Sequence, residues 1–330
     1  MANKTLAERD QDLIWHPYTQ MQNAPAPIPI IRGEGIFLIA EDGKKYIDAI
    51  SSWWVNIHGH SHPYIAKKVS EQLSTLEHVI FAGFTHPGAI ELAERLISIL
   101  PDSQSKVFYS DNGSTAVEVA LKMCFQYWSN QGKEKTKVLA FNNSYHGDTF
   151  GAMAVSARSA FTRPFEKLLF EVEFLDLPDL NNLNKLKSQI SASASEVSAF
   201  IFEPLVQGAG GMQMYEAGYL DELIKHCKNN GILTIADEVM TGFGRTGKLF
   251  ASDYLSEKAD LMCFSKGLTG GTMALGVTTC TSVIYEAFLS DNKFKTLFHG
   301  HSFTANPIAC AAALASMDIL LESETLANIQ

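Results

Sequence analysis

Two short apolar stretches, Ile232-Leu-Thr-Ile-Ala236 and Leu261-Met-Cys-Phe-Ser265, decide the fold because each has the pattern of a buried strand. Asp237 follows the first stretch directly, and Lys266 follows the second. Short continuous apolar runs are typical of strands that are buried on both faces of a parallel sheet. The carboxyl ends of such strands form the edge where open α/β sheets bind ligands. We therefore expect Asp237 and Lys266 to share a ligand site.

The alternation of strand and helix patterns continues through most of the chain. Further strands are predicted at residues 106–109, 138–141, 171–174, 199–202 and 277–280, and helices at 116–128 and 219–229. Strands that alternate with helices favour a mostly parallel sheet with helices on both faces. The expected fold is therefore α/β, with a doubly wound, mostly parallel seven-stranded sheet.

The first sixty residues have a different pattern. Ala24-Pro-Ala-Pro-Ile-Pro29 is Pro-rich and extended, and residues 36–39 and 45–50 resemble a hairpin that turns at Asp42-Gly43. We assign residues 1–60 to the N-terminal part of a small α+β domain and residues 61–330 to the large domain. Within the large domain, Ser191-Ala-Ser-Ala-Ser195 predicts a solvated surface loop.

A candidate anion cradle follows the first strand of the large domain. In Ser110-Asp-Asn-Gly-Ser-Thr-Ala-Val-Glu118, Gly113 allows close backbone approach and Ser114 offers a hydroxyl group. Thr115 and Glu118 have the spacing of a capping box at a helix start, and a helix N-terminus attracts anions. An ordinary helix cap after a tight turn would give the same pattern.

An acid, a lysine and an anion cradle at one sheet edge are what the coenzyme pyridoxal phosphate requires. The lysine would bond to the coenzyme, and the acid would hold the proton on its pyridine nitrogen. Tyr145 follows the strand at 138–141 and could stack on the pyridine or be a surface-loop aromatic. Glu203 ends the strand at 199–202 and could be a solvated carboxylate or a polar contact near the coenzyme.

One motif favours a rival function. Gly242-Phe-Gly-Arg-Thr-Gly247 matches the dinucleotide-binding fingerprint of nicotinamide-dependent oxidoreductases. In that fold the first glycine follows the strand directly and the last one opens a helix. Here Glu238-Val-Met-Thr241 intervenes, and Lys248-Leu-Phe-Ala-Ser252 has no helical period. The flanking sequence therefore disfavours an oxidoreductase.

The histidines and cysteines do not form a recognisable metal or disulfide pattern. His58, His60 and His62 lie in turn sequence without cysteine or acid companions, so we interpret them as turn residues and predict no metal site. The five cysteines are widely spaced among apolar residues and are expected to be reduced core thiols: Cys124, Cys227, Cys263, Cys280 and Cys310.

Composition excludes several other classes of protein. The chain has 330 residues, of which 46% are hydrophobic, enough for a substantial core. Its net charge of -10 argues against binding to nucleic acid or an anionic membrane surface. The N-terminus lacks the apolar stretch of a signal peptide, and no apolar run has the length of a membrane span. We therefore expect a cytoplasmic protein.

Taken together, the motifs resemble those of the class III, fold type I aminotransferases, which use pyridoxal phosphate. The class-level match is Ala236-Asp-Glu-Val-Met-Thr-Gly-Phe-Gly-Arg-Thr-Gly247, followed by Ser265-Lys-Gly267. A narrower match, to the branch that acts in biotin synthesis, rests on Trp15-His-Pro-Tyr-Thr-Gln20, Ser51-Ser-Trp-Trp54, Phe81-Ala-Gly-Phe-Thr-His-Pro87, Tyr145-His-Gly-Asp-Thr-Phe-Gly-Ala-Met153, Gln207-Gly-Ala-Gly-Gly-Met212 and Leu268-Thr-Gly-Gly-Thr272. These motifs cover nearly the whole chain.

The resemblance implies a role for each matching residue. Lys266, Asp237 and Tyr145 would be the catalytic residues, with Asp237 pairing with the pyridine nitrogen. The implied coenzyme contacts are Gly113 and Ser114 at the phosphate, Tyr145 and Val239 on the two ring faces, Glu203, Asp237, Lys266, and Ser302 reaching the phosphate from the partner subunit of a homodimer. The implied substrate contacts are Tyr18, Trp53, Trp54, Tyr145, Lys266 and Gly300. The two tryptophans could instead be plain core residues.

The narrower match also implies substrates. The expected reaction transfers the amino group of S-adenosylmethionine to 8-amino-7-oxononanoate, and the alternative donors are lysine, ornithine or 4-aminobutyrate. Two departures accompany the resemblance. His301 stands where many relatives have proline, and family members continue past Gln330 into the C-terminal part of the small domain. That part includes an arginine for the substrate carboxylate, so a truncated chain that binds coenzyme without turnover is a further alternative.

Overall fold

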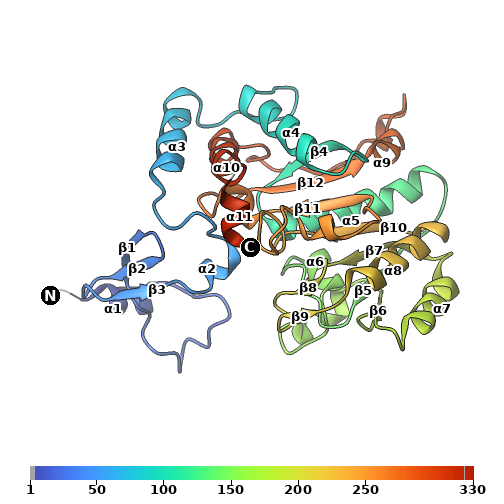
Figure 1. Ribbon diagram of the computed structural model, residues 1–330, viewed down its shortest axis with the longest axis horizontal. Coiled ribbons are helices and arrows are strands. Elements are labelled where there is room, and N and C mark those ends of the chain that lie inside the picture. The colour runs from blue at the N-terminus through green and yellow to red at the C-terminus, as the bar shows by residue number, and fades with distance from the viewer. Residues whose placement is uncertain (1–3, 323) are drawn as a thin grey trace.

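A seven-stranded, mostly parallel sheet forms the centre of the molecule (Figure 1). The computed structural model describes residues 4–322 and 324–330. The strands lie in the order β4 (Gln104–Ser110), β12 (Gly276–Thr281), β11 (Leu261–Phe264), β10 (Leu233–Asp237), β7 (Val197–Phe202), β5 (Lys137–Phe141) and β6 (Val172–Leu175). Strand β12 runs antiparallel to both of its neighbours. All seven predicted strands are confirmed.

Two hydrophobic cores cover the two faces of this sheet, because alternate residues of a strand point to opposite sides. Phe200 and Phe202 pack into one core with helices α4 (Pro87–Ile99), α7 (Leu183–Ser193), α8 (Ala217–Asn229) and α10 (Pro307–Leu320). Ala199 and Ile201 pack into the other core with α5 (Gly113–Asn130), α6 (Phe150–Val155) and α9 (Ser282–Glu286). The expected doubly wound α/β fold is therefore confirmed.

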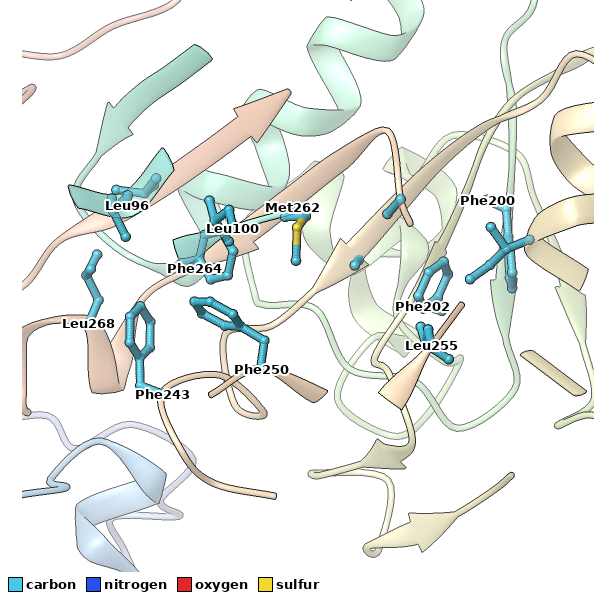
Figure 2. Close-up of a cluster of buried hydrophobic side chains, with 14 of the residues drawn as sticks. Leu96, Leu100, Phe200, Phe202, Phe243, Phe250, Leu255, Met262, Phe264 and Leu268 are labelled. Atoms are coloured by element: carbon cyan, nitrogen blue, oxygen red, sulfur yellow. The ribbon is translucent and has the colours of Figure 1, made fainter. Parts of the chain in front are cut away.

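An aromatic cluster anchors the segment that carries Lys266. The Phe264 ring in β11 lies 5.9 Å from the Phe243 ring and 5.2 Å from the Phe250 ring, measured between centroids. Figure 2 shows these rings beside Leu268, which belongs to the 3-10 helix η3 (Lys266–Thr269). Burial of a large apolar side chain contributes about 1.5–3 kcal/mol. The strand end before Lys266 is thus fixed by packing on both sides of the lysine.

The N-terminal segment forms a separate small sheet away from the large one (Figure 1). Strands β1 (Ile30–Glu34), β2 (Phe37–Ala40) and β3 (Lys45–Ile47) pair in antiparallel order. The predicted hairpin is confirmed as β2 and β3, whereas sequence reasoning missed β1 because Pro29 precedes it directly and Gly33 interrupts its pattern.

After β3 the chain enters a left-handed turn, labelled α2 (Ser51–Trp54). Its four residues have φ angles of 49°, 49°, 66° and 61°. A left-handed conformation costs an L-residue other than glycine roughly 1–2 kcal/mol. Neighbouring contacts must therefore hold this turn in place.

The remaining elements are short connections or surface helices: α1 (Leu6–Leu13), α3 (Pro63–Thr75), α11 (Thr325–Ile329), η1 (Arg163–Leu168), η2 (Ala251–Tyr254), η4 (Lys293–Lys295), β8 (Val206–Gln207) and β9 (Gln213–Met214). The prediction of a loop at residues 191–195 is wrong for residues 191–193, where α7 continues to Ser193, whereas residues 194–195 form a turn. Alanines at alternate positions let the helix persist through this serine-rich stretch. Among the described residues, no helix is both long and apolar enough to cross a membrane.

Candidate active site

The charged residues at the carboxyl edge of the sheet lie on neighbouring strands. The register pairs Asp237 at the end of β10 with Cys263 in β11, three residues before Lys266. On the other side of β10, Ala236 pairs with Phe202 in β7, so Glu203 lies one residue beyond that pair. Asp237 and Glu203 are buried, with 4% and 5% of their surface exposed. The sheet therefore brings two acids and a lysine to one place, as the sequence predicts for Asp237 and Lys266.

Asp237 is held by two hydrogen bonds. Its Oδ2 atom lies 2.7 Å from Nδ1 of His146, and its Oδ1 accepts the backbone N–H of Val239 at 3.0 Å. The His146 side chain is completely buried, and its Nε2 has no hydrogen-bond partner among the described residues. Sequence reasoning did not assign His146 a role. Its position directly after Tyr145, just beyond the end of a predicted strand, could have suggested one.

Lys266 is partly buried and has a left-handed backbone, with a φ angle of 47°. Burial lowers the pKa of its ammonium group below the usual 10.5. The negative charges of Asp237 and Glu203 act in the opposite direction and raise this pKa, but by less. A lowered pKa increases the fraction of neutral amine, which is the nucleophilic and basic form. The Nζ atom lies 5.1 Å from the centre of the Trp54 ring.

Glu203 organises the loop that carries Tyr145. Its carboxylate accepts the backbone N–H of Tyr145 at 3.1 Å and that of Gly208 at 2.9 Å. Burial raises the pKa of Glu203 to about 7, and the Asp237 charge adds to the effect while His146 opposes it. The alternative of a solvated carboxylate is therefore excluded.

Two tyrosines converge on one carboxylate that sequence reasoning missed. The Tyr145 hydroxyl donates to Oδ2 of Asp148 at 2.8 Å, and the Tyr18 hydroxyl donates to the same atom. The two hydroxyl oxygens lie 3.3 Å apart. Burial raises the pKa of both phenols above 10, and the hydrogen bonds to Asp148 support the shift. Tyr18 comes from the N-terminal segment, so this network joins that segment to the loop between β5 and α6.

The N-terminus of α5 has the features expected of an anion cradle. Gly113 is its first residue, and a Cβ atom there would lie only 2.7 Å from Cγ1 of Val239. A Cβ on Gly147 would lie 2.1 Å from Oγ of Ser114, so that loop also approaches the helix closely. Asp148 donates its backbone N–H to Ser114 Oγ at 3.3 Å. These close approaches bring Val239, Ser114 and the Tyr145 loop around one helix start.

The capping of α5 differs from the prediction. The capping box is formed by Asn112 and Thr115, one turn earlier than the predicted pair of Thr115 and Glu118. Glu118 instead accepts the Thr149 hydroxyl at 2.5 Å and the Gly151 backbone N–H at 2.7 Å. A spacing of three residues occurs at both pairs, so the sequence alone could not select the register.

Aromatic residues of the N-terminal segment border the site. Trp54 is half-buried and lies beside Lys266, whereas Trp53 is 53% exposed and lies 5.7 Å from the Tyr18 ring. The alternative of plain core residues is thus excluded for Trp53. Arg245, from the segment that resembles a dinucleotide fingerprint, donates to the Trp54 carbonyl at 3.0 Å. This segment forms turns after β10 without a following α-helix, so it does not have the geometry of a dinucleotide site.

Gly300 and Ser302 are not joined to this cluster within the described residues. Both are exposed in a turn after η4 and make no hydrogen bond with the residues around Lys266. Nearby, Lys122 donates to the Phe298 carbonyl at 2.9 Å and ties this turn to α5. The five cysteines are buried and free, as expected.

The residues present fit pyridoxal phosphate. A partly buried lysine with a lowered pKa, a buried carboxylate on the neighbouring strand and a helix start with close backbone approach are the three features that this coenzyme uses. Residues 18–330 match the family model described as aminotransferase class-III. The chain belongs to this family.

Relatives in the family share most of the sequence. A protein from Synechococcus elongatus, named adenosylmethionine-8-amino-7-oxononanoate aminotransferase, is 52% identical over an alignment of 323 residues that covers 95% of this chain and 76% of the relative. A protein of the same name from Geobacter sulfurreducens is 43% identical, over 98% of this chain and 75% of its own. The narrower resemblance seen in the sequence is confirmed by these matches.

Solved structures agree with this class III assignment. The crystal structure of adenosylmethionine-8-amino-7-oxononanoate aminotransferase from Methanocaldococcus jannaschii has a TM-score of 0.95 and 41% identity, covering 98% of this chain and 76% of its own. An amine transaminase from an uncultivated Pseudomonas species, in its pyridoxal-phosphate-bound form, has a TM-score of 0.88 and 34% identity, covering 93% and 74%. The fold type expected from the motifs is therefore confirmed.

Proposed function

We propose that this chain is a pyridoxal-phosphate-dependent aminotransferase that transfers the amino group of S-adenosylmethionine to 8-amino-7-oxononanoate. The observation that carries the chemistry is the pairing of a partly buried Lys266 with a buried Asp237 at the edge of the sheet. The substrates are suggested by the names of relatives that are 39–52% identical over nearly the whole chain. The product would be 7,8-diaminononanoate, an intermediate of biotin synthesis.

The proposed roles follow from the geometry of each side chain. Lys266 would hold the coenzyme through Nζ and, once the substrate amine has displaced it, would move the proton at the substrate carbon as a neutral amine. Asp237 holds a negative charge beside the pyridine nitrogen and keeps its proton in place. When bound, pyridoxal phosphate supplies an electron-withdrawing ring that takes up the electron pair of the reacting carbon. His146 keeps the Asp237 carboxylate in a fixed orientation by its 2.7 Å contact.

The remaining coenzyme contacts surround this pair. Gly113 and Ser114 would bind the phosphate with backbone N–H groups at the start of α5 and with the Ser114 hydroxyl. Tyr145 and Val239 would lie against the two faces of the ring. Glu203 fixes the Tyr145 backbone through the bond at 3.1 Å. Their close spacing around the helix start supports these roles.

The substrate would lie against the aromatic residues at the mouth of the site. Tyr18, Trp53 and Trp54 present large flat surfaces that suit an adenosyl group and the alkyl chain of an oxo acid. Asp148, which accepts hydrogen bonds from Tyr18 and Tyr145, fixes two of the rings that border this space.

We further propose a homodimer with shared active sites. Gly300 and Ser302 lie in an exposed turn that does not reach the Lys266 cluster within one protomer. The same turn carries exposed Phe298 and Phe303, which are 66% and 60% exposed. Exposed aromatic residues beside a turn are typical of subunit interfaces. In the dimer, Ser302 would donate to the coenzyme phosphate of the other protomer and Gly300 would border its substrate.

The test is the visible absorption spectrum of the purified protein with pyridoxal phosphate, compared with Lys266→Ala. We expect a band that depends on Lys266 and that S-adenosylmethionine abolishes by taking the bound coenzyme to its amino form. Lys67→Ala is the control, since that side chain is exposed on α3. No Lys266-dependent band would disprove the coenzyme role.

The same protein identifies the amino donor. Lysine, ornithine and 4-aminobutyrate are compared with S-adenosylmethionine, and 8-amino-7-oxononanoate is then added to look for 7,8-diaminononanoate. A response to one of the other donors alone would replace the proposed substrate and keep the aminotransferase. A band that no donor changes would favour a protein that binds coenzyme without turnover.

A further inference from the structure

The left-handed turn at Ser51–Trp54 is held by a carboxylate outside the catalytic cluster. It is the only run of four consecutive non-glycine residues with positive φ within residues 4–322 and 324–330. Such a backbone persists only where surrounding contacts determine it, and it is concentrated at functional sites. The sequence supplies no glycine within the turn to relieve the strain.

The carboxylate is that of Asp48, three residues before the turn. Its Oδ1 accepts the backbone N–H of Ser52 at 2.9 Å, and its Oδ2 accepts the Ser52 hydroxyl at 2.7 Å. The Nε2 atom of His60 lies 2.9 Å from the same Oδ2. The Asp48 side chain is only 6% exposed although the turn beside it lies at the surface. Three contacts therefore converge on one nearly buried carboxylate.

A third residue fixes the orientation of His60. The amide nitrogen of Asn56 lies 2.9 Å from Nδ1 of His60. An amide N–H can only donate, so Nδ1 accepts and Nε2 carries the proton that it donates to Asp48. This role accounts for a histidine in the cluster that the sequence singled out, and it needs no metal.

The turn connects this clamp to the site. The Trp54 ring lies 5.1 Å from Lys266 Nζ, and the Trp54 carbonyl accepts a hydrogen bond from Arg245 at 3.0 Å. Trp53 contacts the Tyr18 ring on the other side of the turn. A change of backbone from left-handed to right-handed would point both indole rings elsewhere.

We propose that Asp48 and His60 are positioning residues that hold the left-handed turn and so place Trp53 and Trp54 against the substrate. This inference rests on the proposed function for the identity of the substrate, whereas the clamp itself rests on the hydrogen bonds. Asp48 touches neither Lys266 nor Asp237 and acts only through the turn.

The experiment compares Asp48→Ala with the double variant Asp48→Ala, Ser51→Gly. We expect the single variant to exchange the Ser52 and Trp54 amide hydrogens faster and to lose near-ultraviolet circular dichroism from the tryptophans. The KM for the amino donor should rise about tenfold, while the Lys266-dependent absorption stays unchanged. The double variant should recover most of the slow amide exchange and of the near-ultraviolet circular dichroism, because glycine adopts the left-handed conformation without steric cost. Ser51 is suitable because its side chain makes no hydrogen bond in the described structure.

Asp42→Ala is the matched control. Asp42 lies in the neighbouring hairpin, where it accepts the Lys44 backbone N–H at 3.0 Å, and it does not contact the turn. Asp48→Asn provides a second variant if alanine prevents folding. It keeps the shape of the side chain, but an NH2 group replaces one of the two acceptor oxygens that face the donors of Ser52 and His60. We expect unchanged KM in the control and increased KM in the asparagine variant.

Each outcome separates the clamp from the proposed function. Unchanged amide exchange in both Asp48 variants would overturn the clamp, whatever the enzyme does. Faster exchange with unchanged KM would overturn the positioning role. If Ser51→Gly does not restore the amide exchange and the circular dichroism of the Asp48→Ala variant, relief of backbone strain is not the reason that the turn needs Asp48. Absence of the Lys266-dependent band in the unaltered protein would disprove the proposed function, yet amide exchange would still test the clamp.

Discussion

The two sides of the candidate site are built in opposite ways. Lys266, Asp237 and Glu203 lie at or just after strand ends of the large sheet. Asp237 and Glu203 are almost completely buried. Tyr18, Trp53 and Trp54 come from an N-terminal segment with a small sheet, where both Tyr18 and Trp53 are more than half exposed. The first side is fixed by a hydrophobic core, and the second by a few side-chain hydrogen bonds.

Because of this difference, we expect the two sides to have different roles in the reaction. Groups that hold or move charge need fixed positions and little water, which core strands provide. Groups that contact a variable substrate tolerate more movement, and local hydrogen bonds are enough to orient them. Substitutions on the sheet side should therefore affect chemistry, coenzyme affinity or stability, while substitutions on the N-terminal side should affect substrate binding.

The largest effect is expected for Asp237→Asn. The variant keeps the shape of the side chain but removes the negative charge that is proposed to hold the proton on the pyridine nitrogen, so kcat should fall by about 10²–10³-fold. Coenzyme absorption measured on the same sample should show that the coenzyme remains bound.

Asp260→Asn is the matched control for this substitution. Asp260 precedes β11 and accepts the Thr234 backbone N–H at 2.9 Å, at the opposite end of the same two strands. Its kcat should stay within about twofold of the unaltered protein. An equal loss of activity in both variants would mean that the sheet edge has no special role.

A second effect concerns stability and its dependence on pH. Glu203 has a pKa of about 7 when folded, against a usual value of 4.5, because burial disfavours its charge. Below pH 4.5 both states bind the proton, and between pH 4.5 and 7 only the folded state keeps it. Stability is therefore lost as pH rises through this window, by roughly 3 kcal/mol.

Glu203→Gln should remove this dependence. Denaturant unfolding at the two ends of the window should show a smaller fall in the free energy of unfolding for the variant than for the unaltered protein. Glu94→Gln, on an exposed face of α4, is the control and should leave the pH dependence as it was. Parallel curves for Glu203→Gln and the unaltered protein would show that Glu203 is ionised throughout.

The sheet side could be predicted from the sequence better than the N-terminal side. Short apolar runs before Asp237 and Lys266 fix both the strands and the edge, because strand ends in a parallel sheet meet at one place. The left-handed turn has no such pattern: Ser51 and Trp54 are residues that rarely have positive φ, and their conformation depends on Asp48 and His60. Long-range contacts of this kind are visible only in the folded chain.

Hydrogen-bond partners within the site were the hardest to predict. His146 and Asp148 stand beside Tyr145 in the sequence, but their acceptors and donors come from β10 and from the N-terminal segment. The role of Glu118 also depends on a loop more than thirty residues away. Residue type and spacing identify the candidate lysine and acid, whereas the surrounding network follows from tertiary packing.

A third effect tests the close approach at the start of α5. In Gly113→Ala the new Cβ would lie 2.7 Å from Val239 Cγ1, so Val239 must move away from the position proposed for the ring face. We expect about tenfold weaker coenzyme binding, measured by titration of the apoprotein. Thermal stability should also fall, because the β-branched Val239 side chain cannot easily turn away from the new methyl group.

Gly218→Ala is the control for that substitution. Gly218 also lies near the start of a helix, α8, and a Cβ there would meet nothing within 4 Å. Its coenzyme affinity should not change. Unchanged affinity in Gly113→Ala as well would show that Val239 does not pack against the coenzyme.

The smallest effect is expected when either of the two tyrosine hydroxyls that donate to Asp148 is removed. Tyr145→Phe and Tyr18→Phe each remove a hydroxyl that donates to Asp148, the first from the large domain and the second from the N-terminal segment. Tyr145 is less exposed, at 37% against 57% for Tyr18, and a hydrogen bond to a charged group is worth more where water is excluded. We expect kcat/KM to fall about tenfold for Tyr145→Phe and about threefold for Tyr18→Phe, with the second loss mainly in KM. Because both hydroxyls share one carboxylate, the double variant should lose less than the product of the single losses. A larger loss for Tyr18→Phe would mean that the N-terminal segment contributes to chemistry as much as the sheet does.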